Sequence, residues 1–354
     1  MKRFFFTFII LLFVTGHART QNNVWTASAD SNWNPATAEY KIETAGQLAQ
    51  LAVLVNGGET FEDITFTLTN DIDLSAHNWV PIGNDRSTPF CGAFDGDNHH
   101  IKGLKINNTI TDYSGVYSAL FGRIAGKARI RNLTLSDGEI KGGMGDGTFT
   151  AALVADVSPD DDSKPVHISY CYNLSVKVTA GSGARGGRTG GLIAVARTQP
   201  DGTGNAFITI EACGNKAPVT GVSTSNFTGG LIGWMSAGNK AVLMVTDCYN
   251  TAEVTGSKDC TGGLVGRMQA STEAGVTLRA SVSTGKVKGG EGFTGGLVGH
   301  LTAADELSMA KVAACTVAVD ELTGNKFHTG VFAGKNEHGI LEDNREGLDK
   351  EEKP

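Results

Sequence analysis

Three residues spaced 33 positions apart are the strongest candidates for chemistry in this sequence. Trp234, Arg267 and His300 each follow directly after a glycine-rich hexapeptide. An aromatic ring beside two hydrogen-bonding side chains can hold a sugar by stacking and by polar contacts. A set of such mixed polarity does not suit a core, so we expect these side chains to face outward. The sequence therefore predicts a glycan-binding face, with an ordinary tolerant surface as the other interpretation.

The cysteines could form disulfides or fill a core. Cys171, Cys213 and Cys248 fall at matching places in a repeat, and Ser281 takes the same place in a later copy. An even number of cysteines in an exported chain permits disulfides, but a serine in the series favours small buried fillers. The absence of a CxxC pair argues against a zinc site. The six cysteines are Cys91, Cys171, Cys213, Cys248, Cys260 and Cys315.

Acidic and glycine-rich segments give weaker signals. The run from Asp160 to Asp162 stands between two prolines and is typical of a solvated turn. The segment Gly181–Gly186 matches GxGxxG, but it lies outside any strand-helix unit, so we expect no dinucleotide site. HExxH and GxSxG motifs are absent, and no cofactor is expected. A calcium site is an alternative for a last group of acids, which consists of Asp71, Asp73, Asp95 and Asp97.

A repeat must position all of these residues. The segment TGGLIG begins at Thr228, and TGGLVG begins at Thr261 and again at Thr294. Glycines can cradle a phosphate, but a Walker-type loop needs a following Lys-Ser/Thr and a helix, and neither is expected here. We therefore interpret the hexapeptide as a rung, in which leucine fills the core and glycine allows a close turn. Related rungs begin at Ser118, Thr150, Thr189 and Thr329.

Further columns of matching residues lie between the rungs. Apolar residues two apart precede the cysteine column, as Leu243 and Val245 precede Cys248. That spacing is typical of inward side chains on a strand. Cys260 takes the place that phenylalanine holds in other copies and is interpreted as packing. Another column indicates a tight turn with left-handed backbone; it consists of Asn173, Asn215, Asn250 and Ser283.

Each copy therefore holds about three short strands and shows no helical period. A unit of this size cannot bury its apolar face alone, whereas stacked copies can. The predicted fold class is all-β, a right-handed parallel β-helix with coils of about 33 residues. Neighbouring coils would lie about 4.8 Å apart. The residue that follows each rung forms one outer column, which is Arg123, Asp156, Val195, Trp234, Arg267, His300 and Lys335.

The rungs resemble those of bacterial proteins built of GLUG-motif repeats. The motif is present at Gly230–Gly233, Gly263–Gly266 and Gly296–Gly299. The segment Phe90–Gly96, together with Ile101–Leu104, is similar to one that often precedes such repeats, and the likeness covers roughly residues 40–335. Members of that family occur in exported and surface proteins, including adhesin-like ones and regions that accompany immunoglobulin-A-cleaving metalloproteases. The resemblance implies a fold and a location rather than an activity.

The chain divides into four predicted segments. Residues 1–18 have the basic start, the 11 apolar residues and the small residues of a signal peptide. Residues 19–60 should hold an N-terminal strand and a capping helix, for which Thr44–Gln47 has capping-box spacing. Residues 61–335 form the β-helix, and residues 336–354 read as an acidic flexible tail. This tail or a partner would cover the last coil.

Charge and composition narrow the function. The formal charge of −7 becomes −9 when Lys2 and Arg3 are removed with the signal, which argues against nucleic-acid binding. No second long apolar run suggests a membrane span in the mature chain. We expect an exported, non-catalytic protein of the cell surface, extracellular space or periplasm, which acts in adhesion or binds a glycan or a host matrix protein.

Two alternatives stay open at this point. One is a carbohydrate-active enzyme, a polysaccharide lyase or hydrolase, on the same scaffold. Such an enzyme needs at least three acids, or an acid-arginine set, on adjacent coils, and the sequence has no such column. The other is a passive structural component of the surface.

Overall fold

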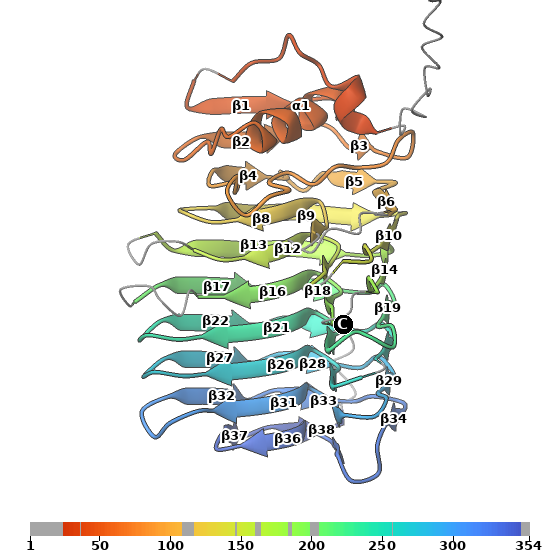
Figure 1. The fold of residues 1–354 in the computed structure, drawn as a ribbon, viewed down its shortest axis with the longest axis vertical. Coiled ribbons are helices and arrows are strands. Elements are labelled where there is room, and N and C mark those ends of the chain that lie inside the picture. The colour runs from red at the N-terminus through yellow and green to blue at the C-terminus, as the bar shows by residue number, and fades with distance from the viewer. Residues whose placement is uncertain are drawn as a thin grey trace, which may run out of the picture.

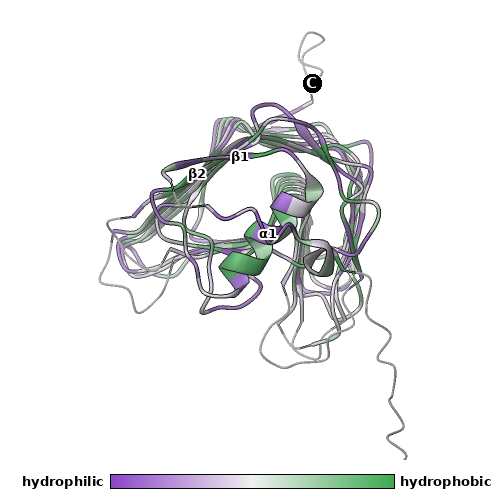
Figure 2. Cartoon of the chain, turned by 90° about the horizontal axis from the view of Figure 1, so that it is seen from above, coloured by the Kyte–Doolittle hydropathy of each residue, from purple (hydrophilic) through white to green (hydrophobic). Residues whose placement is uncertain are grey.

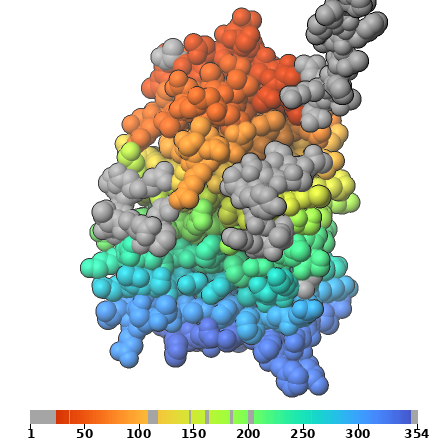
Figure 3. Space-filling model, viewed as in Figure 1, coloured from red at the N-terminus to blue at the C-terminus, as the bar shows by residue number. Residues whose placement is uncertain are grey.

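The chain forms a solenoid of stacked coils (Figure 1). The computed structural model describes residues 24–35, 37–107, 117–145, 147–159, 164–182, 186–198, 205–256 and 258–347. The predicted signal peptide lies outside the described residues. In the space-filling view the colours of the chain follow one another in layers across the long axis, as stacked coils require (Figure 3). The predicted fold class, a mostly β solenoid of parallel strands with one short N-terminal helix, is confirmed.

Four parallel sheets run along the solenoid, and one coil shows their order. From Val242, the chain contributes β22 (Val242–Thr246) and β23 (Tyr249–Asn250) to the first sheet and β24 (Val254–Thr255) to the second. It then adds β25 (Cys260–Gly262) to the third sheet and β26 (Val265–Ala270) to the fourth. The sequence predicted about three strands in each copy. The coil has five strands, because the segment in the first sheet divides at a bend and because the residues at the start of the rung pair as a sheet of their own.

The remaining strands repeat this order. The first sheet also contains β1 (Glu39–Ile42), β2 (Thr65–Leu68), β3 (Ile72–Asp73), β4 (Ala93–Asp95), β5 (His100–Lys102), β9 (Arg129–Ser136), β13 (Val166–Asn173), β17 (Phe207–Glu211), β18 (Gly214–Asn215), β27 (Gly275–Arg279), β28 (Val282–Ser283), β32 (Met309–Ala313), β33 (Thr316–Val317), β37 (Ile340–Glu342) and β38 (Arg345–Glu346). The second contains β6 (Lys105–Asn107), β10 (Glu139–Lys141), β14 (Lys177–Thr179), β19 (Val219–Thr220), β29 (Val287–Lys288) and β34 (Leu322–Thr323). The third contains β7 (Tyr117–Ser118), β11 (Phe149–Thr150), β15 (Arg188–Gly190), β20 (Phe227–Gly229), β30 (Phe293–Gly295) and β35 (Thr329–Gly330). The fourth contains β8 (Phe121–Ile124), β12 (Val154–Val157), β16 (Ile193–Arg197), β21 (Ile232–Ala237), β31 (Val298–Ala303) and β36 (Ala333–Glu337).

Each rung is the corner between the third and fourth sheets. In one copy β20 ends at Gly229, the chain bends at Gly230 and Leu231, and β21 begins at Ile232. Leu231 is fully buried in the main core. A Cβ atom on Gly230 would lie 2.1 Å from the carbonyl oxygen of Gly263 in the next coil. Only glycine allows this approach, so the interpretation of the hexapeptide as a structural rung is confirmed.

The asparagine column does mark a turn, but its backbone is not left-handed. The positive φ angles lie one residue before the cysteine column, as at Ala212 (49°) and Asp247 (55°). These residues bend the first sheet between strands such as β17 and β18. The asparagine side chains instead form a fully buried ladder. The amide of Asn173 donates to Asn215 Oδ1 at 2.9 Å, and that of Asn215 donates to Asn250 Oδ1 at 2.8 Å.

The predicted capping helix closes the N-terminal end. Helix α1 (Ala45–Asn56) follows Thr44, whose side chain accepts a hydrogen bond from the backbone N–H of Gln47, and it ends at Gly57. A short 3-10 helix, η1 (Trp25–Ser28), packs beside it. Seen along the solenoid axis, α1 lies across the opening of the coils (Figure 2). Its buried side chains therefore cover the apolar interior of the first coils.

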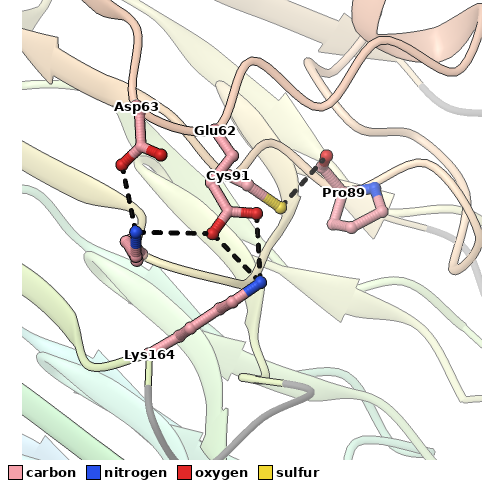
Figure 4. Close-up of polar contacts among 6 residues, drawn as sticks. Glu62, Asp63, Pro89, Cys91 and Lys164 are labelled. Carbon is pink, nitrogen blue, oxygen red and sulfur yellow. Dashed lines mark hydrogen bonds and ion pairs between the residues drawn. The ribbon is translucent and has the colours of Figure 1, made fainter.

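An ion-pair network ties the loop after α1 to later coils. Glu62 contacts Lys164 Nζ at 3.0 Å, and Asp63 contacts Lys127 Nζ at 3.2 Å (Figure 4). The partner lysines lie in different coils, one beside β9 and one before β13. Cys91, drawn beside them, is buried, and its thiol lies 3.8 Å from the carbonyl oxygen of Pro89.

The acidic segment after residue 335 continues the solenoid further than predicted. We expected residues 336–354 to be flexible, but β36 extends to Glu337, and β37 and β38 pair in parallel with β32 and β33. Asn344 takes the next place in the cysteine column, and its side-chain oxygen accepts a hydrogen bond from the backbone N–H of Cys315 at 2.9 Å. Sequence composition favoured a solvated tail, whereas an in-register strand edge binds even a charged segment. Residues 348–354 lie outside the described residues.

Candidate functional site

The three candidate residues lie side by side on the fourth sheet. Trp234 on β21 is in register with Arg267 on β26, and Arg267 is in register with His300 on β31. In β21 the residues that enter the main core are Ile232, Met235 and Ala237, and the first two are three positions apart. The strand thus departs from simple alternation at Gly233, and Trp234 packs against a separate apolar cluster. The predicted register is confirmed, and ligand binding stays a prediction.

The third sheet covers this column from the side. The first residues of the strands from β7 to β30 form a column beside the outer residues of the fourth sheet, and the ring contacts below join the two columns. We call the two facing columns the lateral cluster. Its third-sheet members are Tyr117, Phe149, Arg188, Phe227, Cys260 and Phe293, and its fourth-sheet members are Arg123, Asp156, Val195, Trp234, Arg267, His300 and Lys335.

The expectation that the whole outer column faces water is wrong. Asp156 and Val195 are fully buried, and His300 is 7% exposed. Trp234 and Arg267 are half-buried. The reason is the additional strand that precedes each rung, since its side chains lie against the outer side of the fourth sheet. The site is therefore a partly covered row of side chains rather than an open face.

Phe227 is the centre of the middle part of the lateral cluster. Its ring centroid lies 5.9 Å from that of Trp234, and the Arg267 guanidinium lies 5.4 Å from the Phe227 centroid. Arg188 lies 5.9 Å from the same ring and 5.4 Å from the ring of Trp234. Two guanidinium groups and two aromatic rings thus meet here, a grouping that favours cation-π contacts.

Sequence reasoning missed Arg188. Its signal was its position, because it takes the place of phenylalanine in the column that includes Phe149 and Phe227. An arginine among phenylalanines at one register position indicates a cation placed on an aromatic stack. The guanidinium also lies 5.5 Å from the ring of Phe149. Burial, followed by repulsion from Arg197, lowers the pKa of Arg188.

The N-terminal part of the lateral cluster is a buried charge network. Arg197 binds the Asp156 carboxylate through two hydrogen bonds, of 3.1 and 2.8 Å. The hydroxyl of Tyr117 donates to the same carboxylate at 3.4 Å, and burial is the main cause that raises the pKa of Tyr117. Asp156 is fully buried, so its carboxylate cannot reach a substrate from its present position.

The C-terminal part of the lateral cluster is also paired. His300 Nε2 lies 2.8 Å from Glu337 Oε2 and 3.0 Å from the hydroxyl of Thr302. Burial lowers the pKa of His300 and outweighs the opposing effect of Glu337. Lys335 forms an ion pair with Glu337 and lies 5.0 Å from the Phe293 ring. Burial thus favours the neutral imidazole, which can exchange hydrogen bonds with a polar ligand.

The cysteine column is a ladder of free thiols. All six cysteines are buried, and Cys171, Cys213, Cys248, Cys260 and Cys315 are free thiols. Cys171, Cys213 and Cys248 lie in the core, and the backbone N–H of Cys213 lies 3.4 Å from Cys248 Sγ. Burial raises the pKa of Cys213 and Cys248 well above the usual value. The interpretation as small buried fillers is confirmed, and the disulfide alternative is wrong for this structure. Cys260 is in register with Phe227 and Phe293, as the column predicted.

The other candidate groups are engaged elsewhere. Asp71 binds Lys102 Nζ at 2.7 Å, which lowers the pKa of that carboxyl to about 2. Asp95 binds Arg131 at 2.7 Å. Within the part of the chain that the structure describes, no three potential ligands gather as a metal site. Gly181 and Gly186 flank residues outside the described ranges, and the acids at 160–162 themselves lie outside these ranges.

Comparisons with known proteins support a β-solenoid with distant relatives. No family model matches the chain. It is 31% identical over 140 residues to a "Putative Gly-rich membrane protein" of Evansella cellulosilytica, a match that covers 37% of this chain and 15% of the relative. It is 31% identical over 141 residues to "Halomucin" of Haloquadratum walsbyi, covering 37% of this chain and 1% of the relative. The match thus spans a small part of either relative.

One solved structure has the same general fold. It is a crystal structure of a "putative immunoglobulin A1 protease" from Bacteroides ovatus, with a TM-score of 0.55 and 17% identity. The match covers 89% of this chain and 85% of that one. At this identity the likeness concerns the fold alone. Across the described ranges, no helix has the length and apolarity that a membrane crossing requires.

Proposed function

We propose that this protein is an exported, non-catalytic solenoid that binds a glycan at the lateral cluster. The single observation that carries the proposal is the in-register row of Trp234, Arg267 and His300 beside the ring of Phe227. A half-buried tryptophan offers a stacking surface for a sugar ring. Arg267 and His300 add donors and acceptors at the spacing of neighbouring strands, about 4.8 Å, so a chain of sugars could contact successive coils.

A surface location goes with this function. The signal-like start of the sequence supports export, and the relatives include a protein named for a membrane and one named halomucin. An exported repeat protein with a partly covered row of binding groups suits adhesion to glycans or to a glycosylated matrix protein. If one glycan chain bound at several adjacent coils, the weak contacts together would give a higher overall affinity than any single contact.

Two other functions lead to different results in the same assay. A carbohydrate-active enzyme would shorten a bound polysaccharide, and its acids would have to reach the substrate. A passive structural component would bind no glycan at all. The pairing of buried Asp156 with the neighbouring Arg197 supports the non-catalytic proposal, since this acid is occupied internally.

The test is a glycan array with the full mature chain, followed by titration of the bound glycans. Trp234→Ala should weaken binding at least tenfold, because stacking on an aromatic ring is lost. Phe327→Ala is the matched control, since Phe327 is an aromatic residue that is 78% exposed outside the lateral cluster. Equal binding by the wild type and Trp234→Ala would refute the site. Product release from a bound polysaccharide would favour the enzyme instead.

A further inference from the structure

The middle of the lateral cluster holds positive charge without a matching acid. Arg188 and Arg267 both lie against the ring of Phe227. Their Nε atoms are buried and have no hydrogen-bond partner, and the same is true of Trp234 Nε1. Three N–H donors therefore gather around one ring with no acceptor. A buried donor left unpaired costs free energy, which an incoming acceptor can recover.

We propose that this part of the lateral cluster selects an acidic sugar, whose carboxylate or sulfate group binds between Arg188 and Arg267. The inference rests on the proposed glycan-binding function and adds the substrate class. Guanidinium groups suit oxyanions because their planar N–H donors can form paired, charge-assisted hydrogen bonds. The ring of Trp234 would stack on the same sugar, and its indole N–H would supply a further donor.

The excess of positive charge is confined to the middle of the lateral cluster, as the neighbouring coils show. Arg197 is neutralised by Asp156 at 2.8 Å, and Lys335 is neutralised by Glu337. The same row thus places an acid in contact with its cation at each end. Among the described residues, no acid forms an ion pair with either of the two arginines between them, and Asp156 acts on Arg188 only from a longer distance. If the cations only stabilised the stacked rings, there would be no reason for acids to pair with the cations at the ends and not in the middle.

Burial strengthens the attraction for an anion. Arg188 is half-buried, and its burial and the nearby Arg197 lower the pKa of its guanidinium. An anion placed beside it would offset both the lost hydration and the repulsion between the arginines. The protein as a whole is acidic, so attraction of an anionic glycan must come from this local charge rather than from the net charge.

The experiment compares glycans that differ only in charge. Full-length mature protein is titrated with oligogalacturonate and with its methyl-esterified form, which has the same backbone without the negative charge. Dextran sulfate and dextran form the second pair, so that carboxylate and sulfate are tested separately. We expect at least tenfold tighter binding of one acidic form than of its neutral partner, and weaker binding at higher salt.

Variants then assign the preference to the two arginines. Arg188→Gln and Arg267→Gln should each reduce the acidic preference about tenfold, and Arg267→Lys should restore only part of it because the planar donor pair is absent. Arg279→Gln is the matched control, since Arg279 is exposed on β27 of the first sheet. Thermal melting checks that each variant is folded.

The possible outcomes separate this inference from the proposed function. Equal, Trp234-dependent binding of acidic and neutral forms would overturn the acidic preference and leave glycan binding in place. No binding of any glycan would overturn both. A preference that survives both arginine substitutions would overturn the assignment to Arg188 and Arg267. If a variant fails to fold, the preference of the wild type and its salt dependence still decide whether the bound sugar is acidic.

Discussion

The asparagine ladder and the lateral cluster use the same repeat in opposite ways. Each ladder position from Asn173 to Asn250 carries the same residue, and each side-chain amide bonds a neighbouring coil and its own turn. Each lateral position carries a different residue, from Asp156 to His300. Both rows are built on parallel strands in register. The difference in uniformity therefore does not come from the backbone.

The asparagine ladder and the lateral cluster also differ in how fully their buried polar groups are hydrogen-bonded. The ladder amides from Asn173 to Asn250 all find partners, which fixes the turn between the first and second sheets. In the middle of the lateral cluster, the N–H groups of Trp234 and Arg267 have none. A solenoid gains stability from uniform, satisfied columns. A column that varies and leaves donors unpaired is better explained by binding than by stability.

Removing one ladder asparagine should cause the largest loss of stability. Asn215→Leu removes its bonds to Asn173 and Asn250 and leaves buried amide groups unpaired, so the free energy of unfolding should fall by about 4 kcal/mol. Urea denaturation followed by circular dichroism measures this. Asn215→Ser, which places the residue of Ser283 in the column, should cost less. A loss below about 1 kcal/mol for Asn215→Leu would contradict the ladder's structural role.

Breaking the buried pair at the N-terminal part of the lateral cluster should cost somewhat less. Asp156→Asn leaves Arg197 without its carboxylate, and we expect a loss of about 3 kcal/mol. The loss should vary little with salt because the carboxylate is buried. Glu253→Gln is the control, since Glu253 pairs with Lys288 at the surface; its effect should stay within about 0.5 kcal/mol.

If Asp156→Asn changes the free energy of unfolding only slightly, the N-terminal part of the lateral cluster contributes as little to stability as its middle part. It would then be a binding feature rather than a structural one. A large effect would divide the lateral cluster into a stabilising N-terminal part and a middle part that is open to a ligand. The measurement therefore sharpens the comparison between the two rows.

The sequence predicted the register of both rows because the period of the rungs fixes it. A spacing of 33 residues places Trp234, Arg267 and His300 on successive coils whatever the local detail. It could not predict burial, because that depends on the strand before each rung folding against the fourth sheet. Side-chain period alone does not distinguish an open face from one covered by a later turn of the same coil.

Two other differences have local causes. Arg188 was missed because the column it belongs to was interpreted as apolar packing from its phenylalanines. Left-handed backbone was expected at the asparagines, the residues with the highest tolerance for it, but Ala212 and Ala280 adopt it instead. The asparagine amides are needed for the ladder, and the stacking of coils imposes the bend one position before the cysteines. Tertiary context thus outweighed local preference.

The smallest predicted effect is that of Cys260 ionisation on the free energy of unfolding. It tests whether water is excluded from the lateral cluster as it is from the core. Burial raises the pKa of Cys260 to about 12, against an ordinary value of 9.0. The thiol ionises at lower pH in the unfolded chain than in the folded one. Its contribution to the free energy of unfolding is therefore fully present below pH 9 and is lost as the pH rises from 9 toward 12. At pH 10.5 the ionisation of this thiol should lower the free energy of unfolding by about 2 kcal/mol relative to its value below pH 9.

The matched variant is Cys260→Ala, which removes this titration and leaves the thiols of the core ladder in place. Denaturation at pH 8 and pH 10.5 should show that the wild type loses about 2 kcal/mol more than the variant over this range. Equal losses would mean that Cys260 ionises as readily in the folded chain as in the unfolded one. Water would then enter between the third and fourth sheets, and the unpaired donors of Arg188, Trp234 and Arg267 would be hydrated rather than reserved for a ligand.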